Sequence, residues 1–207
     1  MSPRSYTLGA RAVGIAETRR RVLSAARDLF LQDDVRMVTM NEVARRADVA
    51  RATVYHQFGS KLGLVAALVE DLEERAGLDA LIDVLQQEPP ARLIGSLIAA
   101  GCDYWATDPD LVRKITALGS LQHGVQALLA AHDAGRLSIV TRMVERLAAA
   151  GVLHRECSPE HAIDVLWLLT SFDAYDLLAR GRRLSHDTAA ATLTRLAESE
   201  LVHHRRR

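Results

Sequence analysis

Aromatic residues and helix breakers are scarce in this chain of 207 residues. Aromatic side chains make up only 4% of it, and there are 12 glycines and 5 prolines, whereas 49% of the residues are hydrophobic. Ala, Leu, Arg and Val are abundant, which favours helices over strands and supplies ample material for a core. We therefore predict an all-α fold.

Long apolar runs and cysteines are also scarce. No run of about 18 apolar residues is free of charge, so the sequence predicts no membrane span. The first residues contain no continuous apolar run of the kind that a signal peptide needs, and we interpret residues 1–16 as a flexible, mildly basic arm. Cys102 and Cys157 are the only cysteines, too few for a disulfide framework, which fits a reducing cytoplasm.

The short motifs that mark many enzymes are missing. The chain has no G-x-S-x-G, P-loop, G-x-G-x-x-G or H-E-x-x-H sequence. A grouping of Cys102, Asp103 and His123 can be drawn, but nothing in the sequence requires these residues to be close. We predict that the protein is not an enzyme and needs no cofactor.

Three residues have a spacing that resembles a zinc site. They are His154, Cys157 and His161. A structural zinc ion takes four ligands, and Ser158-Pro159 begins a helix among these three. A loop that joins a helix is the better interpretation, so we predict no metal.

The net charge of zero conceals an uneven distribution. Residues 1–61 hold 11 Lys/Arg and 6 Asp/Glu, whereas residues 62–207 hold 15 and 20. A basic N-terminal third on a mildly acidic remainder suggests that a polyanion binds at one end, although a basic end can also be simple solvated surface.

Three short helices are predicted between residues 17 and 58. An amphipathic stripe, Val22, Ala26, Leu29 and Phe30, marks the first. Thr39 and Glu42 form a capping box at the start of the second. Residues 48–50 are too few for anything but a tight turn, and the third helix covers about 51–58. Helix, tight turn and helix on a basic background are the helix-turn-helix pattern.

The rest of the chain is also predicted to be helical. A connecting helix occupies residues 62–77, and the domain after it occupies 78–207. Its helices are expected at about 90–106, 109–119, 121–131, 134–150, 159–180 and 186–203. Gly151 ends one of them as a cap, and Ser158 with Pro159 starts the next.

The last two helices are predicted to form a dimer interface. The segment 163–178 is apolar around most of its circumference, so it must be covered on both sides. Pairing with the same helices of a second subunit would cover it, and burial within one subunit is the alternative. The residues predicted at this interface are Leu166, Leu169, Leu193, Leu196 and Ala197.

The sequence TMNEVARRADVARATVYHQFGSK, residues 39–61, resembles the DNA-binding domain of the tetracycline-repressor (TetR) family. The resemblance covers residues 17–72 closely; beyond them it rests on length, helical character and two short passages. Asp48 stands where the family usually has Gly, and Asp33-Asp34 follows the first helix where family members often have Gly. The resemblance implies an N-terminal helix-turn-helix domain and a C-terminal ligand-binding and dimerisation domain.

The third helix has the chemistry of a recognition helix. It offers hydrogen-bonding and apolar contacts for bases and phosphates, while Val54 and Phe58 can face inward. Lys61 follows at a helix start, where a cation can hold phosphate. The predicted DNA-binding residues are Thr39, Met40, Asn41, Arg51, Ala52, Thr53, Tyr55, His56 and Lys61; the first three come from the family resemblance.

The family resemblance implies a ligand-responsive repressor that binds a pseudo-palindromic operator as a homodimer. It also implies a pocket for a small effector among the helices between about 78 and 180, whose ligand alters the spacing of two DNA-binding heads. The polar and aromatic candidates for the wall are Tyr104, Trp105, Gln122, His123, Trp167 and Phe172. A transcriptional activator of the same family and a helical protein-interaction adaptor are the alternatives.

Overall fold

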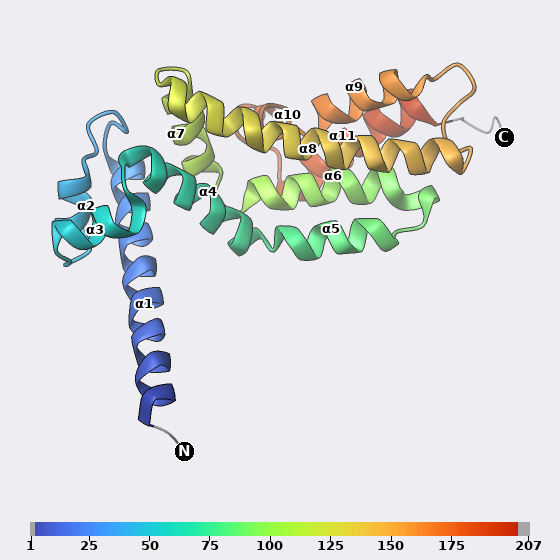
Figure 1. Ribbon diagram of the computed structural model, residues 1–207. Coiled ribbons are helices and arrows are strands. Elements are labelled where there is room, and N and C mark those ends of the chain that lie inside the picture. Colours follow the sequence, from blue (N-terminus) through green and yellow to red (C-terminus); the bar gives the residue numbers. More distant parts are fainter. Residues whose placement is uncertain (1–2, 203–207) are drawn as a thin grey trace. The chain divides into compact units, whose positions relative to one another are not determined.

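A computed structural model of the chain describes the backbone of residues 3–202 and the side chains of residues 13–202. This part of the chain is helical, with no strand beyond an isolated bridge between Leu153 and Val202, so the predicted all-α class is confirmed (Figure 1). The helices are α1 (Pro3–Gln32), α2 (Met40–Arg46), α3 (Arg51–Phe58), α4 (Lys61–Ala76), α5 (Leu78–Gln87), α6 (Pro90–Ala106), α7 (Pro109–Gly119), α8 (His123–Ala149), α9 (Pro159–Leu169), α10 (Phe172–Asp176), the π-helix η1 (Leu177–Gly181) and α11 (His186–Leu201). None of the helices in residues 3–202 has the length and apolar character needed to cross a bilayer.

The chain divides into two compact units. The head consists of Met1–Leu72 and Asp110–Leu129, and the body of Glu73–Pro109 and Ala130–Arg207. The sequence placed everything from residue 78 onward in one C-terminal domain. The segment 110–129 packs with the head instead, because the apolar face of α7 is buried there.

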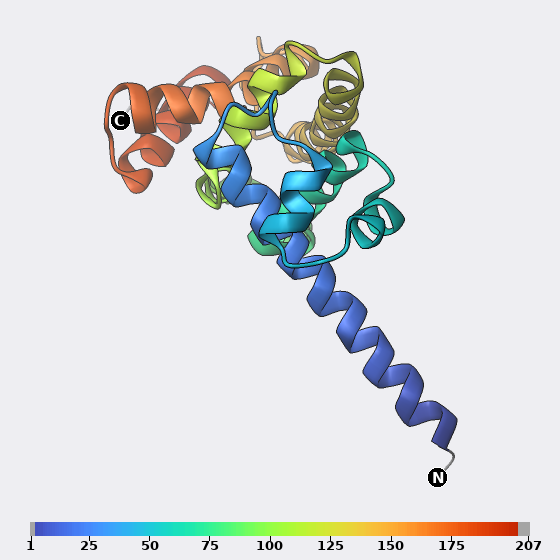
Figure 2. The same cartoon turned by 90° about the vertical axis from the view of Figure 1, so that its left-hand side faces the viewer.

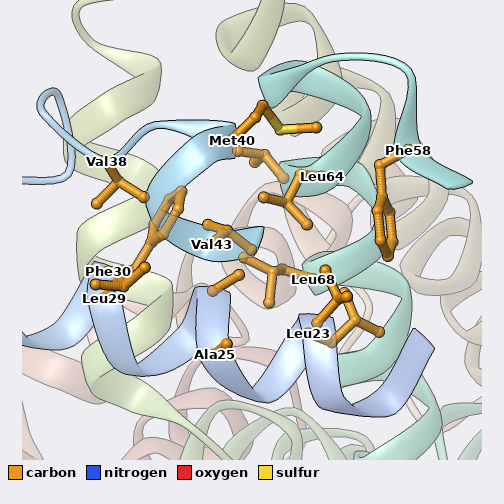
Figure 3. Packing of buried hydrophobic residues seen from close by; sticks show 14 of the residues in the cluster. Leu23, Ala25, Leu29, Phe30, Val38, Met40, Val43, Phe58, Leu64 and Leu68 are labelled. Carbon is orange, nitrogen blue, oxygen red and sulfur yellow. The ribbon is translucent and has the colours of Figure 1, made fainter. Parts of the chain in front are cut away.

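One hydrophobic cluster holds the head together (Figure 3). The C-terminal half of α1 contributes Leu23, Ala25, Leu29 and Phe30, and α4 contributes Leu64 and Leu68. Val22 and Phe30 are fully buried, which matches the predicted stripe. Burial of a large apolar side chain stabilises a fold by roughly 1.5–3 kcal/mol, so this cluster fixes where α2 and α3 lie.

Local sequence signals set the helix-turn-helix. The Thr39 hydroxyl accepts from the Glu42 N–H at 3.2 Å, and the Glu42 carboxylate accepts from the Thr39 N–H at 3.0 Å, so the capping box is confirmed. Asp48 has a φ of 51°, the left-handed conformation that Asp tolerates. Figures 1 and 2 show α2 beside the C-terminal half of α1, and α3 beside α2.

The body packs α6 against α5, α10 and α11, and α9 against α11. Its fully buried residues include Leu93, Ile98, Leu147, Leu166 and Leu201. Ser158 caps α9 through the His161 N–H at 3.1 Å, and Pro159 occupies the first helical position, as predicted.

Several predicted helix boundaries differ from the structure. α8 runs unbroken from His123 to Ala149, although the sequence suggested two helices. The single helix predicted for 159–180 is interrupted, because the Ser171 hydroxyl caps α10 through the Ala174 N–H at 3.2 Å. No helix was predicted from the sequence where α5 lies.

The N-terminal arm predicted for residues 1–16 coincides with the first part of α1, which is helical from Pro3. Leu, Ala and Arg in this stretch favour helix. Residues 1 and 2 and the side chains up to residue 12 lie outside the described part.

Candidate functional site

α3 has one buried face and one exposed face. Val54 and Phe58, one turn apart, lie in the core of the head. Arg51, Ala52, Tyr55 and His56 are exposed, and Thr53 is half-buried. The spacing of i and i+4 anchors the helix on one side and leaves its donors and acceptors available on the other.

Arg51 and Tyr55 form a pair on the exposed face. The guanidinium carbon of Arg51 lies 5.1 Å from the centroid of the Tyr55 ring, one turn further along α3. A cation–π pair at an exposed site contributes about 0.5–1 kcal/mol. The pair therefore restrains both side chains before any partner binds.

The start of α2 presents two of its three predicted residues. Thr39 and Asn41 are exposed, although the Thr39 hydroxyl is already engaged with Glu42. Met40 is only 6% exposed and packs in the core of the head. Met40 was predicted among the DNA-binding residues; its side chain is instead buried in the hydrophobic cluster of the head, so only its backbone remains for a contact.

Lys61 is turned toward the loop between α1 and α2. Its ammonium donates to the carbonyl oxygens of Val35, at 2.7 Å, and Arg36, at 3.1 Å. Partial burial lowers the pKa of Lys61. The predicted phosphate anchor thus has two acceptors within the head, and a third N–H remains.

Lys114 on α7 holds the same loop from another element. Its ammonium donates to the Asp33 carbonyl at 3.0 Å. Within the loop, Asp34 pairs with Arg36, and this interaction lowers the pKa of the Asp34 carboxyl to about 2. The loop that leads into the helix-turn-helix is therefore held by a lysine from α4, a lysine from α7 and an ion pair within the loop itself.

A cavity of about 500 Å³ lies within the body. Its walls come from the end of α4 and from α5, α6 and α8, with Thr170 after α9. Most of the lining surface is apolar, and its aliphatic side chains include Leu78, Leu81, Ile82, Leu85, Leu97, Ile139 and Val140. A volume of this size suits a drug-sized molecule.

Polar groups converge on the cavity from α4, α6 and α8. The Tyr104 hydroxyl lies 3.0 Å from His132 Nε2, and a Glu73 carboxylate oxygen lies 3.6 Å from the same nitrogen. Burial lowers the pKa of His132 and raises the pKa of Tyr104, so both are neutral at neutral pH. Arg136 lines the cavity beside them.

The head matches a known protein family over most of its first segment. Residues 22–68 match the family described as "Bacterial regulatory proteins, tetR family". That segment contains the capping box, the tight turn, α3 and the first half of α4. The head therefore carries a TetR-family domain over these residues.

Relatives of the chain include the uncharacterised HTH-type transcriptional regulator Rv1255c of Mycobacterium tuberculosis. It is 30% identical over 124 residues, which cover 59% of this chain and 57% of the relative. The chain thus matches little more than half the length of that relative. Relatives of this kind are transcriptional regulators rather than enzymes.

Solved structures share the whole fold. NalD, the secondary repressor of the MexAB-OprM multidrug efflux pump in Pseudomonas aeruginosa, is 24% identical with a TM-score of 0.68, covering 93% of this chain and 99% of NalD. A protein from Saccharomonospora viridis, solved in complex with choline, is 18% identical with a TM-score of 0.67, covering 91% of this chain and 100% of that protein. At these identities the likeness concerns the fold alone.

The cavity of the body contains two of the six predicted lining residues, Tyr104 and Trp105. Phe172 packs against Trp105, with ring centroids 5.5 Å apart, and Trp167 packs against Arg136. Gln122 and His123 lie in the head and are exposed, because the segment 110–129 belongs there. Glu73, His132 and Arg136 were not predicted from the sequence; the only signal is the i, i+4 spacing of the last two.

Three of the five predicted dimer residues are buried within the subunit. Leu166, Leu193 and Ala197 have at most 3% of their surface exposed. Leu169 is half-buried, and Leu196 is 54% exposed. The pattern predicted an apolar face on these helices but assigned it to the wrong side, since α11 turns Leu193 and Ala197 inward, where it packs on α6 and α9.

Two of the three residues with zinc-like spacing, His154 and His161, contact the end of α11. His161 Nε2 lies 2.9 Å from a Glu200 carboxylate oxygen, and His154 Nε2 lies 2.9 Å from the Glu200 carbonyl. Across residues 13–202, no group of three His, Cys, Asp or Glu side chains has the geometry of a metal site.

Proposed function

We propose that this protein is a TetR-family transcriptional repressor that binds operator DNA as a homodimer in the cytoplasm. The observation that carries this proposal is the division of α3 into a buried face and an exposed face. Val54 and Phe58 fix the helix to the core, while Arg51, Tyr55 and His56 are free of the core. A helix presented in this way can enter a major groove and contact base edges.

Each exposed residue has a chemical role in this proposal. Arg51 can bind a guanine through two hydrogen bonds, and Thr53 and Ala52 can contact a thymine methyl. Tyr55 and His56 suit phosphate oxygens and adjacent bases. Thr39 and Asn41 lie at the start of α2, whose backbone N–H groups favour phosphate. Lys61 contributes its third N–H to phosphate while it holds the loop.

The homodimer is proposed to form through exposed apolar residues of the last helices. Leu168 on α9, Leu177 on η1 and Leu196 on α11 are 64%, 67% and 54% exposed. Large apolar side chains with this exposure are favourable to cover. A two-fold dimer would cover them and present two copies of α3 to a pseudo-palindromic site.

A small effector is proposed to bind in the body cavity and to lower the affinity for DNA. The cavity has apolar walls and a few convergent polar groups, which are the usual features of a ligand site. The protein of similar fold from Saccharomonospora viridis was solved in complex with choline, which supports a small-molecule ligand for this chain. Differential affinity of the effector for two states of the protein would provide the coupling.

Fluorescence anisotropy tests the proposal. The purified protein is titrated against labelled DNA from upstream of its own coding region and against a scrambled fragment at several salt concentrations. Salt-sensitive binding that prefers the native fragment is expected. Equal binding to both fragments, followed by failure of a random-site selection to enrich any sequence, would contradict the role of α3 as a sequence reader.

A further inference from the structure

We propose that the body cavity binds an amphipathic anion: a largely apolar molecule whose single carboxylate-type head lies against Arg136. This inference rests on the proposed function, because it names the chemical class of the effector for the same cavity. Two observations support it: the apolar shape of the cavity and the poorly compensated charge of Arg136 in its wall.

The shape favours an extended apolar body. Leu78, Leu81, Ile82 and Leu85 all come from α5, and they face the cavity from one side of that helix. Leu97 on α6 and Ile139 and Val140 on α8 extend the apolar wall. An acyl chain or a ring system would bury its surface here at about 25 cal/mol per Å², whereas a small polar ion would leave most of the cavity unfilled.

Arg136 is held rigidly at this cavity. Its Nη1 donates to the Trp167 carbonyl at 2.7 Å and to the Thr170 hydroxyl at 3.0 Å. Its guanidinium carbon lies 3.5 Å from the centroid of the Trp167 ring. These contacts satisfy one edge of the guanidinium with neutral groups, and they fix its position without neutralising its charge.

The charge of Arg136 is poorly compensated. Its side chain is 15% exposed, and its buried Nε–H has no hydrogen-bond partner among the described residues. The nearest carboxylate, that of Asp133, is 3.5 Å away and 52% exposed, so water screens it. Desolvation accordingly lowers the pKa of Arg136. A buried cation with one weak counter-ion is stabilised by an anion that arrives with the ligand.

The other ionisable groups of the wall do not reverse this preference. Glu73 is 35% exposed, which lets water solvate its charge, and it faces the neutral His132. Arg142, also on α8, is exposed at the wall, so it adds positive potential. The least solvated charge of the wall is therefore the positive charge of Arg136. A cationic head would be repelled by it, with no buried carboxylate to offset the repulsion.

Intrinsic fluorescence gives a direct test, because both tryptophans of the chain report on this site. Trp105 lines the cavity, and Trp167 stacks on Arg136. The wild-type protein is titrated with dodecanoate, dodecanol and dodecyltrimethylammonium, each below its micelle-forming concentration. These probes share a twelve-carbon apolar chain and carry an anionic, a neutral and a cationic head. We expect dodecanoate to bind about tenfold or more tightly than dodecanol, and the cation to bind most weakly.

Variants locate the effect at one residue. Arg136→Gln should bring dodecanoate and dodecanol to equal affinity by calorimetry, whereas Arg136→Lys should retain part of the preference. Arg195→Gln is the matched control, an exposed arginine of the body that does not line the cavity, and should keep the preference. If Arg136→Gln does not fold, as judged by its thermal melt, the three probes on the wild type still decide.

Binding of the alcohol or the cation as tight as that of the carboxylate would overturn the inference, and so would an unchanged preference in Arg136→Gln. Anisotropy on DNA is measured separately. If dodecanoate binds but does not release DNA, the inference of an anion site still holds, but the cavity is not the effector site. Weak, sequence-independent DNA binding would instead contradict the proposed function.

Discussion

The Lys61 ammonium lies 2.7 Å from the Val35 carbonyl oxygen, so a residue expected at the DNA surface also fastens the loop that leads into the helix-turn-helix. Two roles are combined in one side chain. Removal of the ammonium should change the stability of the head and its contact with phosphate together, and each change has its own measurement.

Lys61→Met should lower the free energy of unfolding by about 1–2 kcal/mol, because it removes charge-assisted hydrogen bonds to two carbonyls. It should also weaken binding to every DNA sequence and reduce the salt slope by about one unit per subunit. Lys114→Met is the control: it unties the same loop at Asp33 and should leave the salt slope unchanged. Equal slopes in the two variants would make Lys61 a purely structural residue.

Met40→Ala should destabilise the head by about 2–3 kcal/mol, because Met40 is buried in its core. The folded variant should retain its affinity for DNA, measured below its melting temperature. Asn41→Ala, on the exposed side of the same helix, should show the opposite: an unchanged melt and weaker binding. If Met40→Ala melts at the wild-type temperature but no longer binds DNA, the Met40 side chain contacts DNA directly.

Arg51→Ala should cost about 1–3 kcal/mol of discrimination at one base pair of the operator, if the guanidinium binds guanine through two hydrogen bonds. Anisotropy on operators substituted position by position measures this loss. Tyr55→Phe keeps the ring that Arg51 contacts and serves as the control. A loss of the same size on random DNA would identify Arg51 as a phosphate contact.

Leu168→Glu combined with Leu196→Glu should give folded monomers in sedimentation experiments, because both side chains are exposed within the subunit. Leu121→Glu, which changes an equally exposed leucine of the head, should leave the assembly unaffected. Dimers that persist in the double variant would show that the proposed interface lies elsewhere.

Acid should weaken the body through His132. Burial lowers the pKa of this imidazole in the folded protein below its ordinary value of 6.5. The unfolded chain then binds more protons than the folded one, so stability is fully present above about pH 6.5 and falls as the pH drops toward the folded pKa. His132→Gln keeps a hydrogen-bond acceptor near Tyr104. In this variant the melting temperature should depend less on pH between pH 6.5 and the folded pKa of His132. A wild-type profile that stays parallel to that of the variant would contradict this assignment.

The head was predictable because its signals are local. The capping box spans residues 39–42, the left-handed Asp48 needs only its own backbone, and Val54 and Phe58 are one turn apart. Each feature depends on neighbours in sequence, which a reader of the sequence can see. The inward turn of Lys61 was not predictable, since its acceptors lie about 25 residues away.

The body was less predictable because its sites depend on tertiary packing. Glu73 and His132 meet across elements that lie far apart in the chain. Periodicity identified apolar faces on α9 and α11, but it does not state whether a face meets α6 or a second subunit. α8 was predicted as two helices, at 121–131 and 134–150, but it is continuous. Gly135 within it costs about 1 kcal/mol relative to Ala, which is small beside the packing of a helix of 27 residues.

The head is made of two separated stretches of chain, and this has a consequence for anyone who builds chimeras. A fusion that joins residues 1–72 to a foreign partner leaves out α7, whose Leu111, Ile115 and Leu118 are buried in the head. Such a graft would expose the apolar surface that these side chains cover. The transferable cassette is the pair of segments 1–72 and 110–129, so exchange of DNA specificity is better achieved by substitutions on α3 than by cutting at the end of α4.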